Sequence, residues 1–163
     1  MLLQGGATYQ NTFVPMNIPK NRNLGCLVTG TWGRKTAEDY SKIFNNLDVF
    51  EPRDRELETY LDKEYSGFQN IDFLHLTSNE TIEGLQIQNF NTINHKNLII
   101  DMSSDLGSYN FNFNNLSYVY AGAQKNMGPA GTTLVVIRED ILGKVSRKIP
   151  SMMDYKVQIS KGS

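Results

Sequence analysis

The sequence predicts an α/β domain in which a mostly parallel sheet is flanked by helices. Short apolar runs alternate with helix-compatible segments, which is the pattern of parallel strands joined by helices. The chain has 163 residues, of which 39% are hydrophobic, so one domain with a sizeable core can form. Several polar or reactive residues stand directly after predicted strands, and such sheets bind ligands at the carboxyl ends of their strands.

The first 65 residues are expected to contain three helices and two strands. A glycine-rich turn opens a helix over residues 9–17, and residues 24–29 form a short apolar strand. A second helix is expected over residues 36–44, because it begins with a threonine that can act as N-cap and carries two acidic residues in its first turn. Residues 47–50 are compatible with a strand, and the highly charged residues 55–65 with a surface helix.

The second half of the chain supplies most of the predicted sheet. Apolar strands are expected at residues 71–76, 97–101, 117–120 and 132–137. Residues 138–145 are expected to form a short helix after the last of these strands. The loop-like sequence at the end of the chain and the very short segment before the first glycines suggest that both ends are cut from something longer.

Composition excludes several classes of function. The chain carries 16 basic and 17 acidic residues, so it lacks the basic excess of a nucleic-acid-binding protein. No apolar run approaches the roughly 20 residues of a membrane span. One cysteine, Cys26, and two histidines, His75 and His95, are too few for a structural zinc site, and we expect no metal. A lone cysteine also fits a reducing, cytoplasmic setting.

Two segments in the first third of the chain are candidates for ligand binding. The turn Gly5-Gly6-Ala7-Thr8 precedes a helix, where free backbone N–H groups favour a phosphate, although such a turn can equally be structural. Trp32, the only tryptophan, follows a predicted strand. It belongs either to the core or to a surface on which a planar ring stacks.

Asp101 ends an apolar strand and therefore needs a polar partner. A metal ion is one option, although the only nearby acidic residue is Asp105. A protonated ring nitrogen is another. The structural alternative is a helix N-cap or an Asx-turn supported by Ser103 and Ser104.

Lys125 lies in the most informative stretch of the chain. It follows a predicted strand and is surrounded by Gly122, Gly128 and Gly131. Small residues let a bulky ligand approach the backbone. A lysine held in such an apolar frame can lose its proton and form a Schiff base.

The segment Ala121-Gly122-Ala123-Gln124-Lys125-Asn126-Met127-Gly128-Pro129-Ala130-Gly131 resembles the cofactor-lysine segment of the phosphoserine aminotransferase family, which belongs to the class V pyridoxal-phosphate aminotransferases. Other segments agree with the family in the same order. These are residues 5–8, 14–17, 29–32, 77–84, 101–104, 137–143 and 150–155. The resemblance covers essentially the whole chain.

The resemblance implies the large domain of a fold-type I pyridoxal-phosphate enzyme and a role for each matching residue. Lys125 would carry the cofactor and move the proton at the substrate carbon, and Asp101 would hold the pyridine nitrogen protonated. Trp32 would stack on the ring, and Thr81 would contact the cofactor near its phenolic oxygen. The phosphate would be held by Ala7, Thr8 and Gln124.

The implied reaction is amino transfer between L-glutamate and 3-phosphohydroxypyruvate in serine biosynthesis, with pyridoxine biosynthesis as a second role of some members. The family is homodimeric. Residues 1–163 would form the central part of the large domain, without the N-terminal segment and the C-terminal small domain that supply most substrate-binding residues. The alternatives are a non-catalytic fragment that binds the cofactor or a partner, and another class V enzyme such as a desulfurase or a kynureninase.

Overall fold

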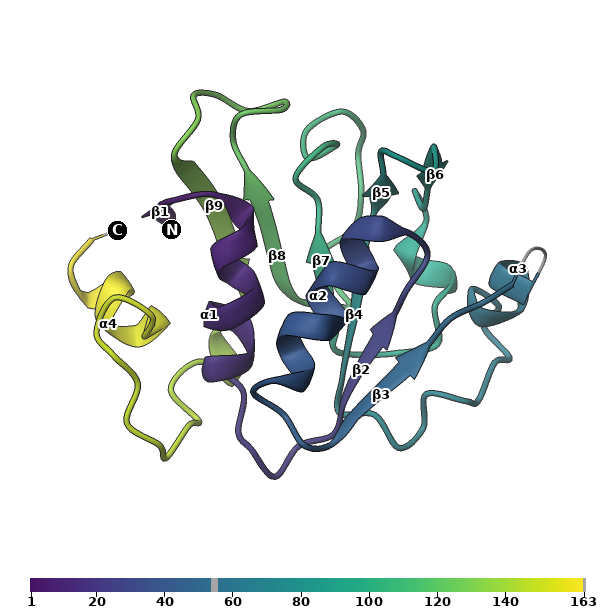
Figure 1. Ribbon diagram of the computed structural model, residues 1–163, viewed down its shortest axis with the longest axis horizontal. Coiled ribbons are helices and arrows are strands. Elements are labelled where there is room, and N and C mark those ends of the chain that lie inside the picture. The colour runs from purple at the N-terminus through teal and green to yellow at the C-terminus, as the bar shows by residue number, and fades with distance from the viewer. Residues whose placement is uncertain (54–55, 163) are drawn as a thin grey trace.

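A seven-stranded sheet forms the centre of the computed structural model, which describes residues 1–53 and 56–162 (Figure 1). Five neighbouring strands are parallel, the sixth, β9 (Thr132–Ile137), runs antiparallel to β8 (Leu116–Gly122), and the edge strand β1 (Leu2–Gln4) runs antiparallel to β9. The predicted α/β class with a mostly parallel sheet is confirmed. In spatial order the strands are β1 (Leu2–Gln4), β9 (Thr132–Ile137), β8 (Leu116–Gly122), β7 (Leu98–Asp101), β4 (Phe73–Thr77), β2 (Leu24–Leu27) and β3 (Leu47–Phe50).

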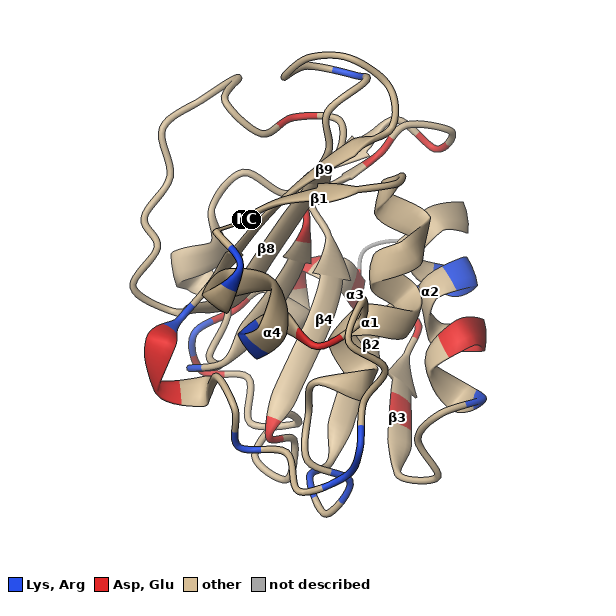
Figure 2. Cartoon of the chain, turned by 90° about the vertical axis from the view of Figure 1, so that its left-hand side faces the viewer, with Lys and Arg blue, Asp and Glu red and all other residues tan. Residues whose placement is uncertain are grey.

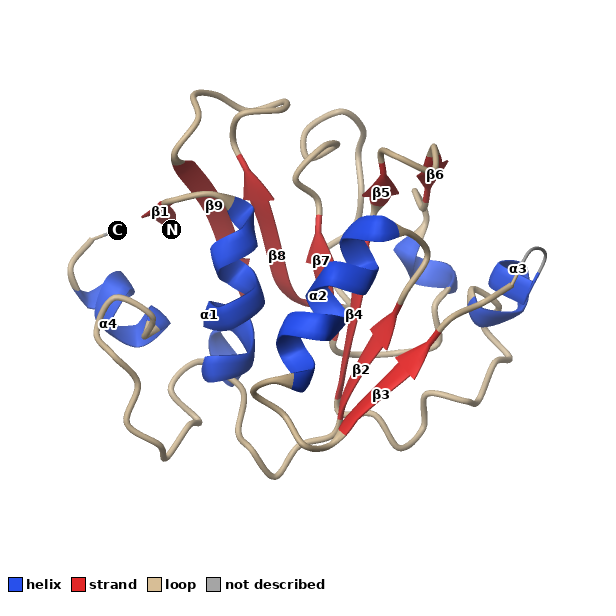
Figure 3. Cartoon of the chain, viewed as in Figure 1, coloured by secondary structure: helices blue, strands red, loops and turns tan. Residues whose placement is uncertain are grey.

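Two helices cover one face of the sheet (Figures 1 and 3). The 3₁₀ turn η1 (Ala7–Tyr9) leads into α1 (Gln10–Met16), and α2 (Thr31–Ser41) packs beside it. Charged residues of α2 lie on the side turned away from the sheet (Figure 2). Helix α2 is therefore amphipathic, and its buried face meets the core.

The core consists of two apolar clusters, one on each face of the sheet. Cys26 and Ile99 belong to the cluster under α1 and α2, whereas their neighbours Leu27 and Ile100 belong to the cluster on the opposite face. Successive side chains of a strand point to opposite faces. Burial on both faces explains why these strands appear in the sequence as continuous apolar runs.

Helix α2 begins five residues earlier than predicted. Thr36 is not the N-cap but lies inside the helix, where it is buried and its hydroxyl contacts the Trp32 carbonyl at 3.2 Å and Asn11 Oδ1 at 3.3 Å. The helix instead starts after Gly30, and its first N–H groups are bonded by two glutamates from a distant segment. A local capping pattern therefore pointed to the wrong residue.

Two predicted helices are much shorter than expected. The charged segment forms only α3 (Glu56–Tyr60), and Arg55, where the prediction began, lies outside the described residues. After β9 only the 3₁₀ turn η3 (Glu139–Ile141) forms. It ends because Leu142 is extended and Gly143 has a φ of +70°, a left-handed conformation that stops a helix.

Several elements were not predicted. The hairpin β5 (Asn79–Glu80) and β6 (Leu85–Gln86) follows β4, and 3₁₀ turn η2 (Phe90–Thr92) comes after it. The helix α4 (Tyr155–Ser160) forms within the segment whose end was expected to be loop-like, because the Asp154 side chain accepts hydrogen bonds from its first N–H groups. Within the described ranges, no helix is long and apolar enough to cross a membrane.

Candidate functional site

A cavity of about 170 Å³ opens at the carboxyl ends of the parallel strands. The predicted residues that line it come from segments far apart in the sequence, and they are Ala7, Thr8, Trp32, Asp101, Gln124 and Lys125. Thr81 does not line the cavity. The topology thus places six separately predicted residues at the edge where a parallel α/β sheet binds its ligands.

Asp101 ends β7 with its two oxygens in different roles. Its Oδ1 accepts hydrogen bonds from the Ser103 amide at 2.9 Å and from the Ser103 hydroxyl at 2.5 Å, which is the Asx-turn considered from the sequence. Among the described residues no donor is hydrogen-bonded to Oδ2. Burial raises the pKa of this carboxyl, while the Ser103 bonds and the charge of Lys125 act in the opposite direction.

A metal site at Asp101 has no support. In the part of the chain that the structure describes, no three His, Cys, Asp or Glu side chains gather as a metal site would require. The Oδ2 atom remains compatible with the second possibility, a protonated nitrogen of a ligand ring.

Trp32 faces the cavity and does not belong to the core. It is 36% exposed, and the Nζ atom of Lys125 lies 5.3 Å from the centre of its ring. This separation is within the range of a cation–π contact. The indole Nε1 donates a hydrogen bond to Thr81 Oγ1 at 3.0 Å. Thr81 thus contacts Trp32 directly although it does not line the cavity.

The glycines of the site allow its segments to approach closely. Gly5 has a φ of +108°, and its amide donates to the Gly131 carbonyl at 2.8 Å, which ties the first turn to the loop after Lys125. A Cβ at Gly122 would lie 2.7 Å from Gln124 Oε1 and 3.3 Å from the Ala7 Cβ. Glycine at position 122 therefore leaves the room that these two cavity residues occupy.

Sequence reasoning missed several residues that line the cavity. Lys35 lies one helical turn after Trp32, and this i, i+3 spacing could have indicated it. Thr77 is buried beside Asp101 in the sheet register, and its hydroxyl has no hydrogen-bond partner among the described residues. Thr77 directly follows the predicted strand 71–76, and this place at the carboxyl end of a strand could have indicated it. The remaining lining residues that were not predicted to bind a ligand are Asn11, Thr36, Asn79, Ser103 and Ser104.

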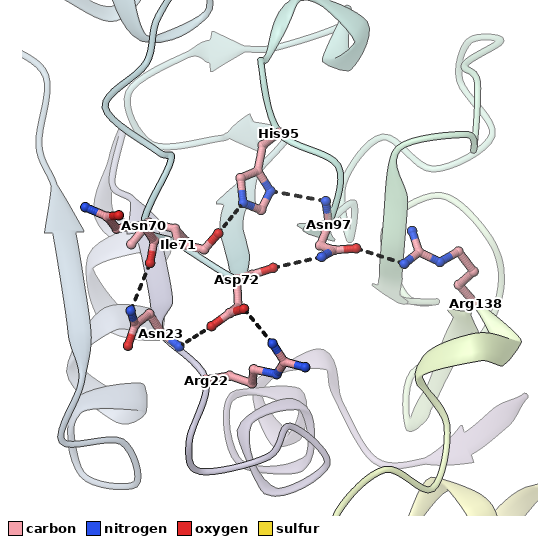
Figure 4. Close-up of polar contacts among 8 residues, drawn as sticks. All are labelled: Arg22, Asn23, Asn70, Ile71, Asp72, His95, Asn97 and Arg138. Atoms are coloured by element: carbon pink, nitrogen blue, oxygen red, sulfur yellow. Dashed lines mark hydrogen bonds and ion pairs between the residues drawn. The ribbon is translucent and has the colours of Figure 1, made fainter.

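A larger cleft of about 700 Å³ lies at the opposite edge of the sheet, where the parallel strands begin. Its polar residues mainly bond one another (Figure 4). Asp72 accepts from Arg22 Nη1 at 2.9 Å, and its carbonyl accepts from Asn97 Nδ2 at 2.9 Å. Asn97 Oδ1 in turn accepts from Arg138 at 2.8 Å. The first two bonds join the starts of β2, β4 and β7, and the third joins the start of β7 to the end of β9, so the network ties strand ends together.

Comparisons with known proteins agree on one family. The family described as aminotransferase class V matches residues 5–161. Phosphoserine aminotransferases from Flavobacterium johnsoniae and Alkalihalobacillus alcalophilus are 43% and 38% identical to the chain. Each alignment covers all of this chain and 46% of the relative. The chain thus spans about half the length of the curated relatives it matches.

Solved structures lead to the same family. Phosphoserine aminotransferase from Bacillus circulans subsp. alkalophilus superposes with a TM-score of 0.82 at 36% identity, covering 100% of this chain and 46% of that one. The pyridoxal-phosphate-bound phosphoserine aminotransferase from Trichomonas vaginalis gives a TM-score of 0.83 at 28% identity, covering 99% and 49%.

Proposed function

Because the chain belongs to the class V aminotransferase family, we propose that it is part of a phosphoserine aminotransferase. The proposed reaction transfers an amino group between L-glutamate and 3-phosphohydroxypyruvate in serine biosynthesis, with pyridoxal 5′-phosphate as cofactor. The names of its relatives support this reaction. The observation that carries it is the convergence of Lys125, Asp101 and Trp32 on one cavity.

The residues of the cavity fit this cofactor. Trp32 presents a ring on which a planar pyridine can stack, and the Lys125 amine lies 5.3 Å from the centre of that ring. The Thr77 hydroxyl and Asp101 Oδ2 are polar atoms without a protein partner among the described residues. Gly122 leaves space where a side chain would collide with Gln124. A flat, polar and anionic ligand would satisfy each of these features.

In the proposed mechanism each side chain has one task. When bound, pyridoxal phosphate supplies an electron-withdrawing ring that weakens the bonds at the substrate α-carbon. Lys125 would hold the cofactor through Nζ and then move the proton at that carbon. Asp101 Oδ2 would keep a proton on the ring nitrogen, which requires an ionised carboxylate. The Ser103 bonds favour this ionised state against the effect of burial.

Trp32 and the residues on the phosphate side would bind the cofactor and orient it. Trp32 would fix the plane of the ring, and Thr81 would act by holding the indole. Ala7, Thr8 and Gln124 would hold the phosphate at the start of the η1–α1 segment. Exact placement of the reacting atoms is worth orders of magnitude in rate, so these contacts matter for catalysis.

The proposal includes a larger assembly. We infer that residues 1–163 form the central part of the cofactor-binding large domain of a homodimeric, cytoplasmic enzyme. The share of the relatives that the chain covers supports this inference. The cavity volume supports it too, because 170 Å³ is below the roughly 300–1,000 Å³ of complete small-molecule sites. A free, buried Cys26 is in keeping with a reducing compartment.

Two alternatives make different predictions. A desulfurase needs a reactive, mobile cysteine, whereas Cys26 is fully buried in β2 and burial raises its pKa. A non-catalytic fragment would bind the cofactor without responding to glutamate. The sequence of the lysine segment does not resemble that of a desulfurase or a kynureninase.

The test is to add pyridoxal phosphate to the purified chain and to Lys125→Ala. We expect a new near-visible absorbance band and, after borohydride treatment, a mass increase on the peptide that contains Lys125. Lys35→Ala is the matched control, because Lys35 lines the same cavity, and it should keep the band. L-Glutamate should discharge the band if the chain can perform half of the reaction. An adduct that is spread over many lysines would contradict the proposed cofactor site.

A further inference from the structure

A buried carboxylate lies next to the proposed site without lining it. Glu80, at the end of β5, has no exposed surface. Its Oε2 accepts a hydrogen bond from the Trp32 amide at 2.9 Å, and its Oε1 accepts from the Gly33 amide at 2.8 Å. A buried charge is costly unless it is hydrogen-bonded, and these two bonds favour the charged carboxylate against the effect of burial.

The backbone around Glu80 leaves room for its side chain. Gly30, the N-cap of α2, has no side chain that could cap the helix. A Cβ at Gly30 would lie 2.7 Å from Glu80 Cδ and 2.5 Å from Glu83 Oε2. A Cβ at Gly33 would lie 3.0 Å from Glu80 Oε1. The missing side chains of α2 are therefore replaced by carboxylates from the β5–β6 hairpin.

The same hairpin holds both ends of Trp32. Glu80 bonds the backbone amide, and the next residue, Thr81, accepts from the indole Nε1 at 3.0 Å. The negative charge also complements the positive end of the α2 dipole. With both its amide and its indole N–H bonded, Trp32 loses most of its freedom to turn.

We propose that Glu80 is a positioning residue of this site, whose carboxylate fixes the first turn of α2 and with it the plane of the Trp32 indole. The proposal rests on the proposed function in one respect, namely that the group stacked on the indole is a planar pyridine ring. Glu80 itself touches no reacting atom.

Glu83 is the natural control. Its Oε1 accepts from the Thr31 amide at 2.8 Å and from the Thr31 hydroxyl at 2.6 Å, so it caps the same helix. Glu83, however, is exposed and does not bond Trp32. Bonds of exposed charges contribute little, because water replaces them. The two glutamates differ in burial and in their contact with Trp32.

The experiment compares Glu80→Gln with Glu83→Gln. In Glu80→Gln the new side-chain amide would turn its NH₂ group toward a backbone N–H, so one of the two bonds is lost. Trp32 is the only tryptophan, and its fluorescence therefore reports on this one side chain. Without cofactor, Glu80→Gln should shift the emission to longer wavelength and make acrylamide quenching clearly stronger, whereas Glu83→Gln should resemble the wild type. Pyridoxal phosphate should bind roughly tenfold more weakly to Glu80→Gln.

Further measurements keep the proposal falsifiable if Glu80→Gln fails to fold. Thr81→Val frees only the indole and should loosen Trp32, and Thr81→Ser should restore the signal. In the wild-type chain, hydrogen exchange at the Trp32 and Gly33 amides should be slow. Fast exchange there, or unchanged emission in a folded Glu80→Gln variant, would overturn the proposal. If the wild type binds no pyridoxal phosphate while Glu80→Gln still loosens Trp32, the proposed function fails and the positioning role stands.

Discussion

Two neighbouring residues of the sheet, Cys26 and His75, illustrate how burial decides the chemistry of a side chain. They are register partners in β2 and β4, and both are fully buried. Burial raises the pKa of the thiol and lowers the pKa of His75 to about 3. At neutral pH neither group is charged. Both belong to the core, although a thiol beside an imidazole is also the pairing found in nucleophilic enzymes.

His75 should make the stability of the chain depend on pH. In the unfolded chain its pKa is near 6.5, and in the folded chain it is about 3, so the unfolded state binds the additional proton between these values. The contribution of neutral His75 to the free energy of unfolding is fully present above pH 6.5. It decreases by roughly 1.4 kcal/mol for each pH unit between pH 6.5 and about 3. Urea unfolding of His75→Gln across pH 4–7 should show a smaller slope than the wild type.

His95 supplies the comparison for this prediction. It is less buried, and although burial lowers its pKa, its hydrogen bonds with the Ile71 carbonyl and the Asn97 amide act in the opposite direction. His95→Gln should therefore change the pH slope less than His75→Gln does. Equal slopes in both variants would mean that burial of His75 does not control its proton.

At the scale of the element, α2 depends on contacts from a distant hairpin. Its first N–H groups are bonded by Glu80 and Glu83, about 50 residues later in the chain. We expect Gly30→Ala to destabilise the fold by about 1–3 kcal/mol, because the new Cβ would overlap both carboxylates. Gly30 has an extended backbone, so conformational strain is not the cause. Chemical denaturation measures the effect.

Gly6→Ala is the control for Gly30→Ala. Gly6 is also an N-cap glycine, but no atom lies within 4 Å of the position that its Cβ would take. Its stability should change by less than about 0.5 kcal/mol. Equal losses in the two variants would show that loss of an N-cap glycine, and not collision with the glutamates, is responsible.

The elements also show what the sequence can predict. The six strands predicted from apolar runs all form. Four of them, β2, β4, β7 and β8, are buried along almost their whole length, so the signal lies in the strand itself. The start of α2 could not be predicted, since Thr36 offers a local cap and the actual caps are non-local. Six predicted site residues meet in one cavity, whereas Thr77 and Glu80 were not predicted as site residues, because only the fold shows what they contact.

At the scale of the whole molecule, the C-terminal segment is bound to the first helix. The Tyr155 hydroxyl donates to Gln10 Oε1 at 2.5 Å, and both residues are buried. Asn17 Nδ2 also donates to the Met153 carbonyl at 2.6 Å. These bonds join residues that lie more than 130 positions apart. Both ends of the chain thus pack on the same part of the core.

Tyr155→Phe should weaken this connection. The substitution keeps the ring but leaves the buried Gln10 oxygen without its donor, which costs about 1–3 kcal/mol. Tyr9→Phe is the matched control, because Tyr9 is largely exposed and should lose less than about 0.5 kcal/mol. Thermal unfolding of both variants checks the difference. Similar stability of the two variants would mean that the Tyr155 bond contributes nothing.

The bond between Gly5 and Gly131 has a consequence for the order in which the molecule folds. It closes a loop of more than 120 residues, and the cavity is complete only when that loop is closed. Contacts between such distant segments form slowly, because the chain entropy of the whole loop must be lost first. The cavity should therefore be among the last features to assemble during refolding. In a stopped-flow experiment, far-UV ellipticity should recover before the capacity to bind pyridoxal phosphate.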